Sequence, residues 1–296
     1  MNTSVQRSEA VATGAGAVRG VVADGIRIFR GIPYGAPTSG ENRFRPPQAP
    51  APWTGERDAV EYGQTAPQTF TRLALGGTKG NRPGLGEDCL CLNVWTPACD
   101  DGRRPVMVWF HGGGFEAGTG SMLLYDGSNV ARRGDVVVVT VNHRLNVFGH
   151  LHLDHLGDEW AGSANVGFLD LVAALEWVRD NISGFGGDPG NVMIYGQSGG
   201  GRKVSIAMAA QSAQGLFHKG VVQSGSHLRL LDPDRAAGLT DGLLDQLGIA
   251  RRDARRLQDV PTDVLVDAQA KVRGRFSPTA DGVVFDDHPW DPAAPT

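Results

Sequence analysis

The sequence has little cysteine and no long apolar run. Its three cysteines, Cys89, Cys91 and Cys99, are an odd number and match no metal-binding pattern, so they predict neither a disulfide framework nor a metal site. Residues 1–20 lack the apolar segment of a signal peptide. The apolar run at 136–141 is far too short to span a bilayer. These absences predict a cytoplasmic protein with no membrane partner.

Basic charge is not in excess either. The net charge is −4, whereas nucleic acids and anionic membranes bind basic patches, so we expect neither as a partner. Glycine, in contrast, is abundant. The 42 glycines among 296 residues are about twice the average share, which indicates many tight turns or close backbone approaches.

Short apolar segments alternate with helical patterns, as is typical of an α/β protein with a mostly parallel central sheet flanked by helices. Near-continuous apolar runs predict strands that are covered on both faces. These strands lie at residues 105–110, 136–141, 191–195 and 220–223. We expect a single domain over residues 1–296.

Helices are predicted by apolar residues at spacings of three and four. Such a pattern runs from Phe168 to Ile182, and Gly184 is expected to end that helix. Two further helices are predicted near the C-terminus, at 239–247 with Gly248 as its end, and at 262–272.

A G-x-S-x-G motif occupies residues 196–200, between the predicted strand at 191–195 and a run at 201–210 that can be helical. A serine on a sharp turn from strand to helix projects its hydroxyl, and flanking glycines relieve the crowding of the strained backbone. The motif alone can arise by chance in a glycine-rich chain. Its position between a strand and a helix favours Ser198 as a nucleophile.

Three consecutive glycines follow the strand at 105–110, in the sequence His111-Gly-Gly-Gly-Phe115. Consecutive glycines let backbone N–H groups point at one spot, as an oxyanion hole requires. A dinucleotide site is the alternative, because Gly112, Gly114 and Ala117 match G-x-G-x-x-A and Asp135 lies near the expected distance. That fingerprint needs a helix here, whereas the residues after Phe115 have loop character. The motif therefore favours a hydrolase.

Both motifs belong to a longer series that resembles the type-B carboxylesterases, the family of para-nitrobenzyl-esterase-like enzymes and cholinesterases. The other matching segments are Phe29-Arg-Gly-Ile-Pro-Tyr34, Arg43-Phe44, Glu87-Asp-Cys-Leu90, Asn142 with Arg144, Phe185-Gly-Gly-Asp-Pro189 and Gln223-Ser-Gly-Ser226. The resemblance implies an α/β-hydrolase fold and ester hydrolysis through a serine acyl-enzyme, without a cofactor.

The resemblance also assigns roles to individual residues. It implies Ser198 as the nucleophile and the N–H groups of Gly113, Gly114 and Gly199 as the oxyanion hole. It further implies an ion pair between Arg43 and Glu87 as structural support, although two unrelated surface charges are the alternative.

Three positions depart from the family pattern. Gln197 stands where many members have glutamate, which disfavours cationic substrates and favours small uncharged or aryl/alkyl esters. Ala66 lies where secreted members have a cysteine, so Cys89 is expected to be a free buried thiol in a reducing compartment. His143 replaces a usual tyrosine and is interpreted as a packed or surface residue.

The acid and the histidine of the triad follow the serine in the chain order of this fold. His218 and His227 flank the strand at 220–223 and are interpreted as structural or surface residues. Asp281 and His288 have the right order, but they resemble the segment that precedes the family's acid. We expect the acid and the histidine beyond Thr296, and little ester hydrolysis by residues 1–296 alone.

The same reasoning predicts a sheet truncated before its last strands. The strand at 220–223 would then be an edge, open to self-association. A non-catalytic hydrolase-fold protein that only binds its ligand stays open as an alternative function, because a fold does not guarantee its chemistry.

Overall fold

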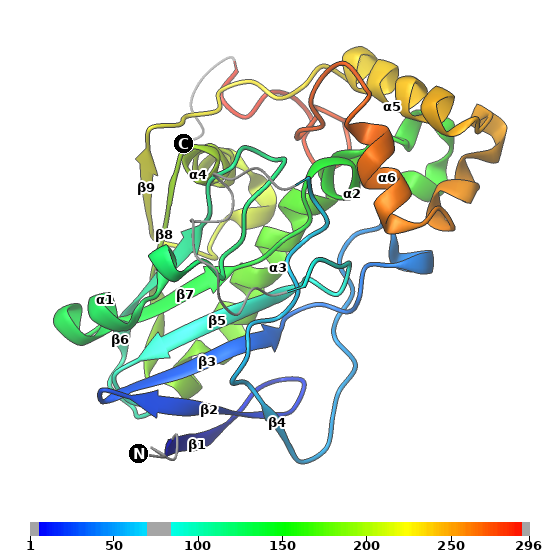
Figure 1. Ribbon diagram of the computed structural model, residues 1–296. Helices are drawn as coiled ribbons and strands as arrows, with labels where there is room; N and C mark the ends of the chain where they lie inside the picture. Colours follow the sequence, from blue (N-terminus) through cyan, green and yellow to red (C-terminus); the bar gives the residue numbers. More distant parts are fainter. Residues whose placement is uncertain (1–5, 70–83, 292–296) are drawn as a thin grey trace.

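The computed structural model describes residues 6–69 and 84–291 (Figure 1). In this part of the chain, nine strands form one sheet in the order β1-β2-β3-β5-β7-β6-β8-β9, and β4 pairs with β2 beside this path. The strands are β1 (Gln6–Ala12), β2 (Ala17–Ala23), β3 (Ile26–Pro33), β4 (Glu56–Asp58), β5 (Cys91–Thr96), β6 (Arg104–Phe110), β7 (Val137–Val141), β8 (Gly187–Gln197) and β9 (Lys219–Gln223).

Along the strand order given above, the first half of the sheet is antiparallel, while β4 beside it pairs with β2 in parallel. Short turns join β1 to β2 and β2 to β3, and strands joined so closely must run in opposite directions. The antiparallel pairing continues from β3 to β5 and from β5 to β7. The sheet is therefore mixed, and the expected mostly parallel arrangement holds only for its second half.

The second half contains β7, β6, β8 and β9, which are parallel. The four strands predicted from apolar runs all lie here. In β6, the side chains of Val106, Val108 and Phe110 are fully buried, because helices cover the sheet. The carboxyl ends of these strands share one edge of the sheet, where the residues after β6 and β8 come together.

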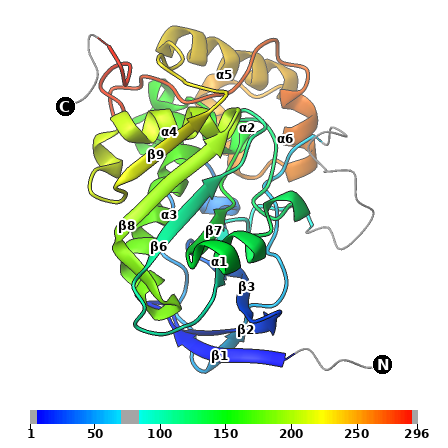
Figure 2. The same ribbon diagram turned by 90° about the vertical axis from the view of Figure 1, so that its left-hand side faces the viewer.

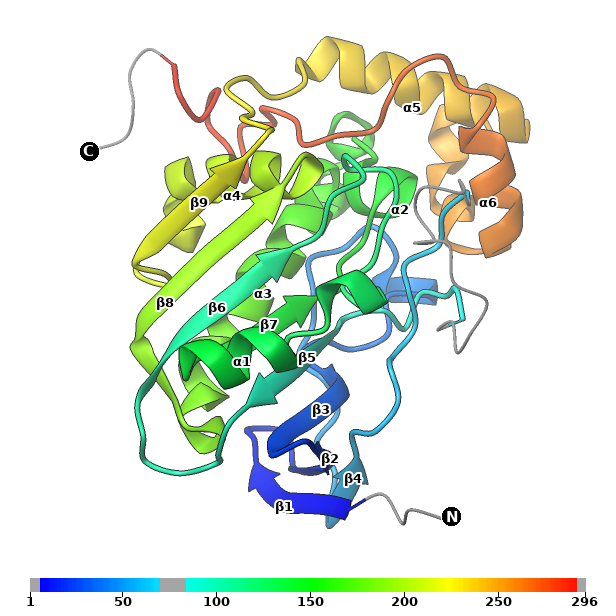
Figure 3. The same cartoon turned by 60° about the vertical axis from the view of Figure 1, so that its left-hand side comes forward.

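Helices cover both faces of the sheet. Helix α1 (Ser128–Gly134) lies on one face, while α3 (Val166–Asn181) and α4 (Gly199–Ala209) lie on the other (Figures 2 and 3). The helix predicted from Phe168 onward is α3. The helix ends at Asn181 and is followed by a short 3-10 turn. The left-handed residue that ends this turn is Gly186, with φ 76°. The prediction of Gly184 as the stop is therefore wrong.

The remaining helices, α2 (Asn146–His150), α5 (Pro233–Leu247) and α6 (Thr262–Gln269), gather beyond the carboxyl ends of the parallel strands (Figure 1). Helix α5 begins where the Asp232 side chain accepts a hydrogen bond from the Asp234 N–H, and it ends at the predicted Gly248, with φ 64°. Leu243, Leu257 and Leu265 form a second apolar core there. In the described ranges we find no helix with the length and apolar character needed to traverse a bilayer.

Candidate active site

Ser198 occupies a strained turn between β8 and α4. Its backbone has φ 56° and ψ −118°, a combination that is costly for a residue with a side chain. Two hydrogen bonds hold it there: the Ser198 N–H donates to the Gln223 carbonyl at 2.8 Å, and the Ser198 carbonyl accepts from the Arg202 N–H at 3.0 Å. The strand before the turn, the helix after it and β9 therefore fix the serine.

The glycines of this turn, residues 196–200, allow it to approach β6 closely, and the turn is called the elbow below. A β-carbon on Gly196 would lie 2.5 Å from the carbonyl carbon of Gly200, and one on Gly200 would overlap the Phe110 carbonyl oxygen. Alanine at either position would push the elbow away from the sheet. These glycines are therefore required by the geometry of the turn.

The glycine loop that follows β6 lies against this elbow. A β-carbon on Gly112 would be 3.8 Å from the Ser198 β-carbon, and one on Gly199 would overlap the Gly114 nitrogen. Gly113 and Gly114 have φ values of 96° and 68°, which side chains disfavour. Within the described residues, the N–H groups of Gly113 and Gly114 donate no hydrogen bond, so they are free to bind an acceptor.

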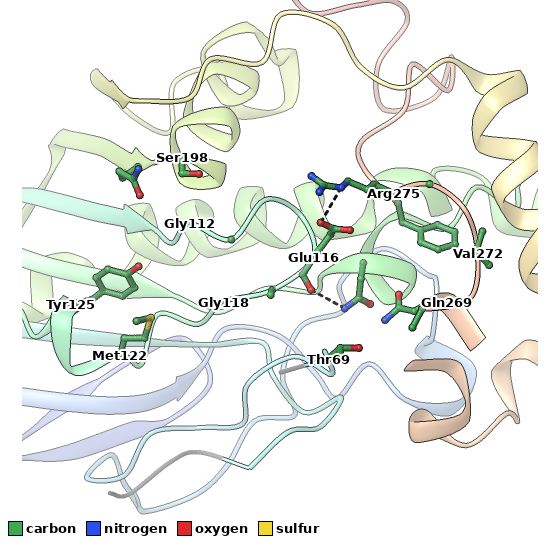
Figure 4. Close-up of a pocket in the computed structure, with 17 residues that line it drawn as sticks. Thr69, Gly112, Glu116, Gly118, Met122, Tyr125, Ser198, Gln269, Val272 and Arg275 are labelled. Carbon is green, nitrogen blue, oxygen red and sulfur yellow. Dashed lines mark hydrogen bonds and ion pairs between the residues drawn. The ribbon is translucent and has the colours of Figure 1, made fainter. Parts of the chain in front are cut away.

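A cavity of about 790 Å³ opens in front of the serine. Figure 4 shows Ser198 and Gly112 on one side of it and Val272 and Arg275 on the opposite side. The Arg275 guanidinium lies 3.5 Å from the Glu116 carboxylate, so these two opposite charges form an ion pair at the cavity wall. The cavity therefore joins the elbow to the segment after α6.

In the part of the chain that the structure describes, the Ser198 hydroxyl has no hydrogen-bond partner. The rings of His218 and His288 accept hydrogen bonds from the Val192 and Leu230 N–H groups, both at 3.1 Å. The Asp281 carboxylate binds Asn165 and the N–H groups that follow it, so the structure does not bring Asp281 and His288 to the serine.

His227 is also engaged in packing. Its ring lies edge-on to Phe115 with centroids 5.4 Å apart, and burial, followed by the charge of Arg202, lowers its pKa to about 4. These contacts agree with the interpretation of His218 and His227 as structural or surface residues. The His143 ring is buried and stacked on His111, as a packed histidine should be.

A dinucleotide fingerprint does not fit the glycine loop. The loop from His111 to Gly120 contains no helix, and the next α-helix, α1, begins only at Ser128, after a 3-10 turn at Leu123–Tyr125. The fingerprint places its phosphate at a helix that opens within the motif. This alternative is therefore set aside.

Arg43 and Glu87 form a buried, two-pronged ion pair, with distances of 2.9 Å from Nε to Oε2 and 2.6 Å from Nη2 to Oε1. The Arg43 Nη1 group also donates to the Leu257 and Val260 carbonyls, and the Thr262 hydroxyl donates to Glu87. The pair therefore connects the N-terminal loops to the helices beyond the sheet.

A second buried ion pair, which sequence reasoning missed, joins Arg144 to Asp170 on α3. The distances are 2.9 Å from Arg144 Nε to Asp170 Oδ2 and 2.6 Å from Nη2 to Oδ1, and both side chains are almost completely buried. The signal in the sequence was Asp170 itself, an acid on the apolar face of the predicted helix.

The cysteines are unpaired. Cys89 and Cys91 are buried free thiols, which confirms the prediction for Cys89, and Cys99 is partly buried. Burial raises the pKa of Cys89 well above its usual value and that of Cys91 to about 12. Neither thiol is therefore a nucleophile at neutral pH.

A strained serine between a parallel strand and a helix, beside a glycine loop with free N–H groups, defines a protein of the α/β-hydrolase class. The sequence model of the Carboxylesterase family matches residues 7–294, and the chain belongs to this family. It is 42% identical over 263 residues to the para-nitrobenzyl esterase of Bacillus subtilis (strain 168), covering 89% of this chain and 53% of that protein. It is 43% identical over 214 residues to the phenmedipham hydrolase of Pseudarthrobacter oxydans, covering 72% of this chain and 42% of the relative.

Solved structures show the same fold. A structure of PNB esterase superposes with a TM-score of 0.90 at 39% identity, covering 95% of this chain and 59% of the other. The Geobacillus stearothermophilus carboxylesterase EST55 superposes with a TM-score of 0.87 at 42% identity, covering 95% of this chain and 57% of the other. The fold is thus the α/β-hydrolase fold, and the chain spans about half the length of the curated relatives it matches.

Proposed function

We propose that the chain supplies the nucleophile, Ser198, and the oxyanion hole, formed by the N–H groups of Gly113, Gly114 and Gly199, of a serine carboxylic ester hydrolase. The observation that carries this proposal is the contact of the strained serine turn with the glycine loop. A β-carbon on Gly199 would overlap Gly114, so the proposed donors from the two segments lie next to each other. Membership of the carboxylesterase family supports it.

In this mechanism the Ser198 oxygen attacks the ester carbonyl carbon, and its proton passes to a general base. The carbonyl oxygen becomes an anion that the backbone N–H groups stabilise. The intermediate then collapses: the bond to the alcohol oxygen breaks, and that oxygen takes up the proton. Water next attacks the acyl carbon and gives a proton to the base. The bond to the Ser198 oxygen breaks, that oxygen takes the proton back, and the carboxylic acid leaves. The described residues place no base against Ser198, so we expect residues 1–296 alone to turn over p-nitrophenyl esters slowly.

We infer a small uncharged or aryl/alkyl ester as the substrate. Gln197 lines the cavity next to the serine and carries no charge, while Glu116 and Arg275 pair with each other. Two relatives are named para-nitrobenzyl esterase and phenmedipham hydrolase, which agrees with this class. The free Cys89 and Cys91 support a reducing compartment, for which we propose the cytoplasm.

The nucleophile is tested by substituting Ser198. A fluorophosphonate probe should label the full-length protein that contains this sequence, and Ser198→Ala should reduce labelling by at least about 1,000-fold, because the attacking oxygen is removed. Ser183→Ala, at an exposed serine after α3, is the matched control and should label normally. Mass spectrometry of the labelled peptide measures the result.

Persistent labelling of the Ser198→Ala protein would show that another residue reacts and would refute the assignment. An unlabelled wild-type protein that still binds an ester in the cavity would favour the alternative of a non-catalytic binding protein.

We also propose self-association through β9. The strand ends the sheet in the described structure, and it pairs with β8 on one side only. Val221 and Val222 are 38% and 37% exposed, so an apolar edge with free backbone groups faces outward. A second copy of the chain could pair with this edge.

Light scattering on the 296-residue chain should therefore show concentration-dependent dimers or larger species. Val221→Lys should shift the distribution toward monomer, because a charge on an edge strand opposes pairing. The control is Val264→Lys, at a valine of α6 that is 42% exposed. A monomer at every concentration in the wild-type chain would contradict edge pairing.

A further inference from the structure

Lys203 is a buried lysine on α4, behind the glycine loop. Its side chain is 1% exposed, and its ammonium group donates a hydrogen bond of 2.9 Å to the His111 carbonyl. In the described residues no carboxylate pairs with it. A lysine is rarely buried without an acidic partner, because removing its charge from water is costly. The stability of helix α4 therefore does not require Lys203, and its presence there indicates another role.

The lysine contacts both ends of the loop that bears the proposed oxyanion donors. At the start it holds the His111 carbonyl, and at the end its nitrogen lies 5.8 Å from the centre of the Phe115 ring. The Phe115 carbonyl in turn accepts a hydrogen bond of 2.6 Å from the Asn146 N–H. The three glycines between His111 and Phe115 have no side chains to fix them. The Gly113 carbonyl accepts a hydrogen bond of 3.1 Å from the Ala117 N–H, and the contacts of the lysine hold the two ends of the loop.

The surroundings of Lys203 leave its charge uncompensated. His111 and His143 stack with ring centroids 4.9 Å apart, and burial together with the positive charge of Lys203 lowers the pKa of both. Other titratable or charged groups of this region are His150, His227, Arg202 and the Arg144–Asp170 ion pair. Asp170 is bound to Arg144 rather than to Lys203. An anion that forms on the other side of the loop would meet this positive potential.

We propose that Lys203 is a positioning residue for the proposed ester hydrolysis: its ammonium group holds the His111 carbonyl and thereby directs the N–H groups of Gly113 and Gly114 toward the oxyanion. This inference rests on the proposed function. The charge is present at low pH and is lost as the pH rises, since burial lowers the pKa of Lys203 to about 7. Its contribution should therefore decline above neutral pH.

A first experiment reads the contact directly and needs no catalysis. His111-Gly112 is the one His-Gly pair in the sequence, so histidine labelled with ¹³C at its carbonyl and glycine labelled with ¹⁵N give a single correlated resonance. In the wild-type chain, the His111 carbonyl shift should titrate with a midpoint near pH 7. Lys203→Met should move the resonance and abolish the titration, while the control Lys219→Met, at an exposed lysine, should leave both unchanged.

A second experiment tests the effect on the reaction in the full-length protein. At pH 6, Lys203→Met should slow fluorophosphonate labelling of Ser198 by about tenfold or more, and the deficit should shrink by pH 9, where the wild-type amine is neutral. A lysine that only fills space would give the same deficit at both pH values. Thermal melts confirm that each variant is folded.

The outcomes separate the two proposals. If wild-type Ser198 is not labelled, the proposed function fails, and the carbonyl resonance still decides whether Lys203 holds the loop. An unchanged resonance in Lys203→Met overturns the inference. So does a labelling rate that is equal to wild type, or reduced equally at pH 6 and pH 9, in a folded variant.

Discussion

Replacing Asp170 by alanine should lower the free energy of unfolding by about 3–5 kcal/mol. The Asp170 carboxylate accepts three hydrogen bonds from Arg144, one from the backbone N–H and two from the guanidinium. The Arg144 side chain is 1% exposed, so the substitution leaves a permanent cation buried without its counter-charge. The loss is large because the remaining charge cannot reach water or give up its proton.

Urea unfolding at pH 7, followed by circular dichroism, measures this change. Asp241→Ala is the control: it breaks the ion pair with Arg251 at the surface, and exposed pairs contribute no more than about 1 kcal/mol. A loss in Asp170→Ala no greater than in Asp241→Ala would contradict the expectation. It would mean that Arg144 finds another partner or solvent once Asp170 is gone.

The parallel half of the fold was predictable because its strands have a simple pattern. Strands covered by helices on both faces are apolar at nearly every position, and β6 and β7 show this in the sequence. The antiparallel half was not predicted. In β1, five of the seven residues are exposed, so its sequence resembles a polar loop as much as a strand. Its pairing with β2 stabilises it, and that pairing is a tertiary contact.

The serine turn and the glycine loop could be predicted because their chemistry depends on residues close together in sequence. What could not be predicted is how close the two segments come, since the close approach of Gly199 to Gly114 depends on the register of β6 and β8. The roles of these residues remain a proposal, but their proximity is part of the fold.

Lys203 and Asp170 show a different limit. Each charged residue lies four positions from buried apolar or glycine neighbours on its helix: Lys203 between Gly199 and Ala207, and Asp170 between Val166 and Ala174. That spacing places both on the buried face of the helix. A charge on such a face is a signal that a partner or a function lies opposite, although the sequence does not identify it.

The protein should lose stability steeply in weak acid, by about 5 kcal/mol between pH 6 and pH 5. The cause is a group of buried histidines, His111, His143, His150 and His227. Burial lowers the pKa of the first two well below the usual 6.5 and that of His150 to about 3, and burial with the charge of Arg202 lowers that of His227 to about 4. Well above pH 6.5 these rings are neutral in both the folded and the unfolded chain, so they no longer lower the stability.

As the pH falls below 6.5, the unfolded chain binds protons that the folded chain cannot accept. Each of the four rings then contributes up to about 1.4 kcal/mol per pH unit, and the contributions of His227 and His150 end near their folded pKa values of about 4 and about 3. Lys203 adds nothing in this range, because its ammonium is charged in both states below a pKa of about 7. Between pH 6.5 and 5 the expected loss is roughly 6 kcal/mol, comparable with the whole stability of many domains.

Urea unfolding at pH 7, 6 and 5 tests this slope. His143→Gln should remove about one quarter of it, since one of the four rings no longer takes up a proton on unfolding. Gln214→Asn, at an exposed residue that does not titrate, is the control and should leave the slope unchanged. A free energy of unfolding that is constant from pH 7 to pH 5 would show that the buried rings are protonated in the folded chain. In that case the cluster behind the glycine loop would carry several positive charges, and the field at the proposed oxyanion hole would not depend on Lys203 alone.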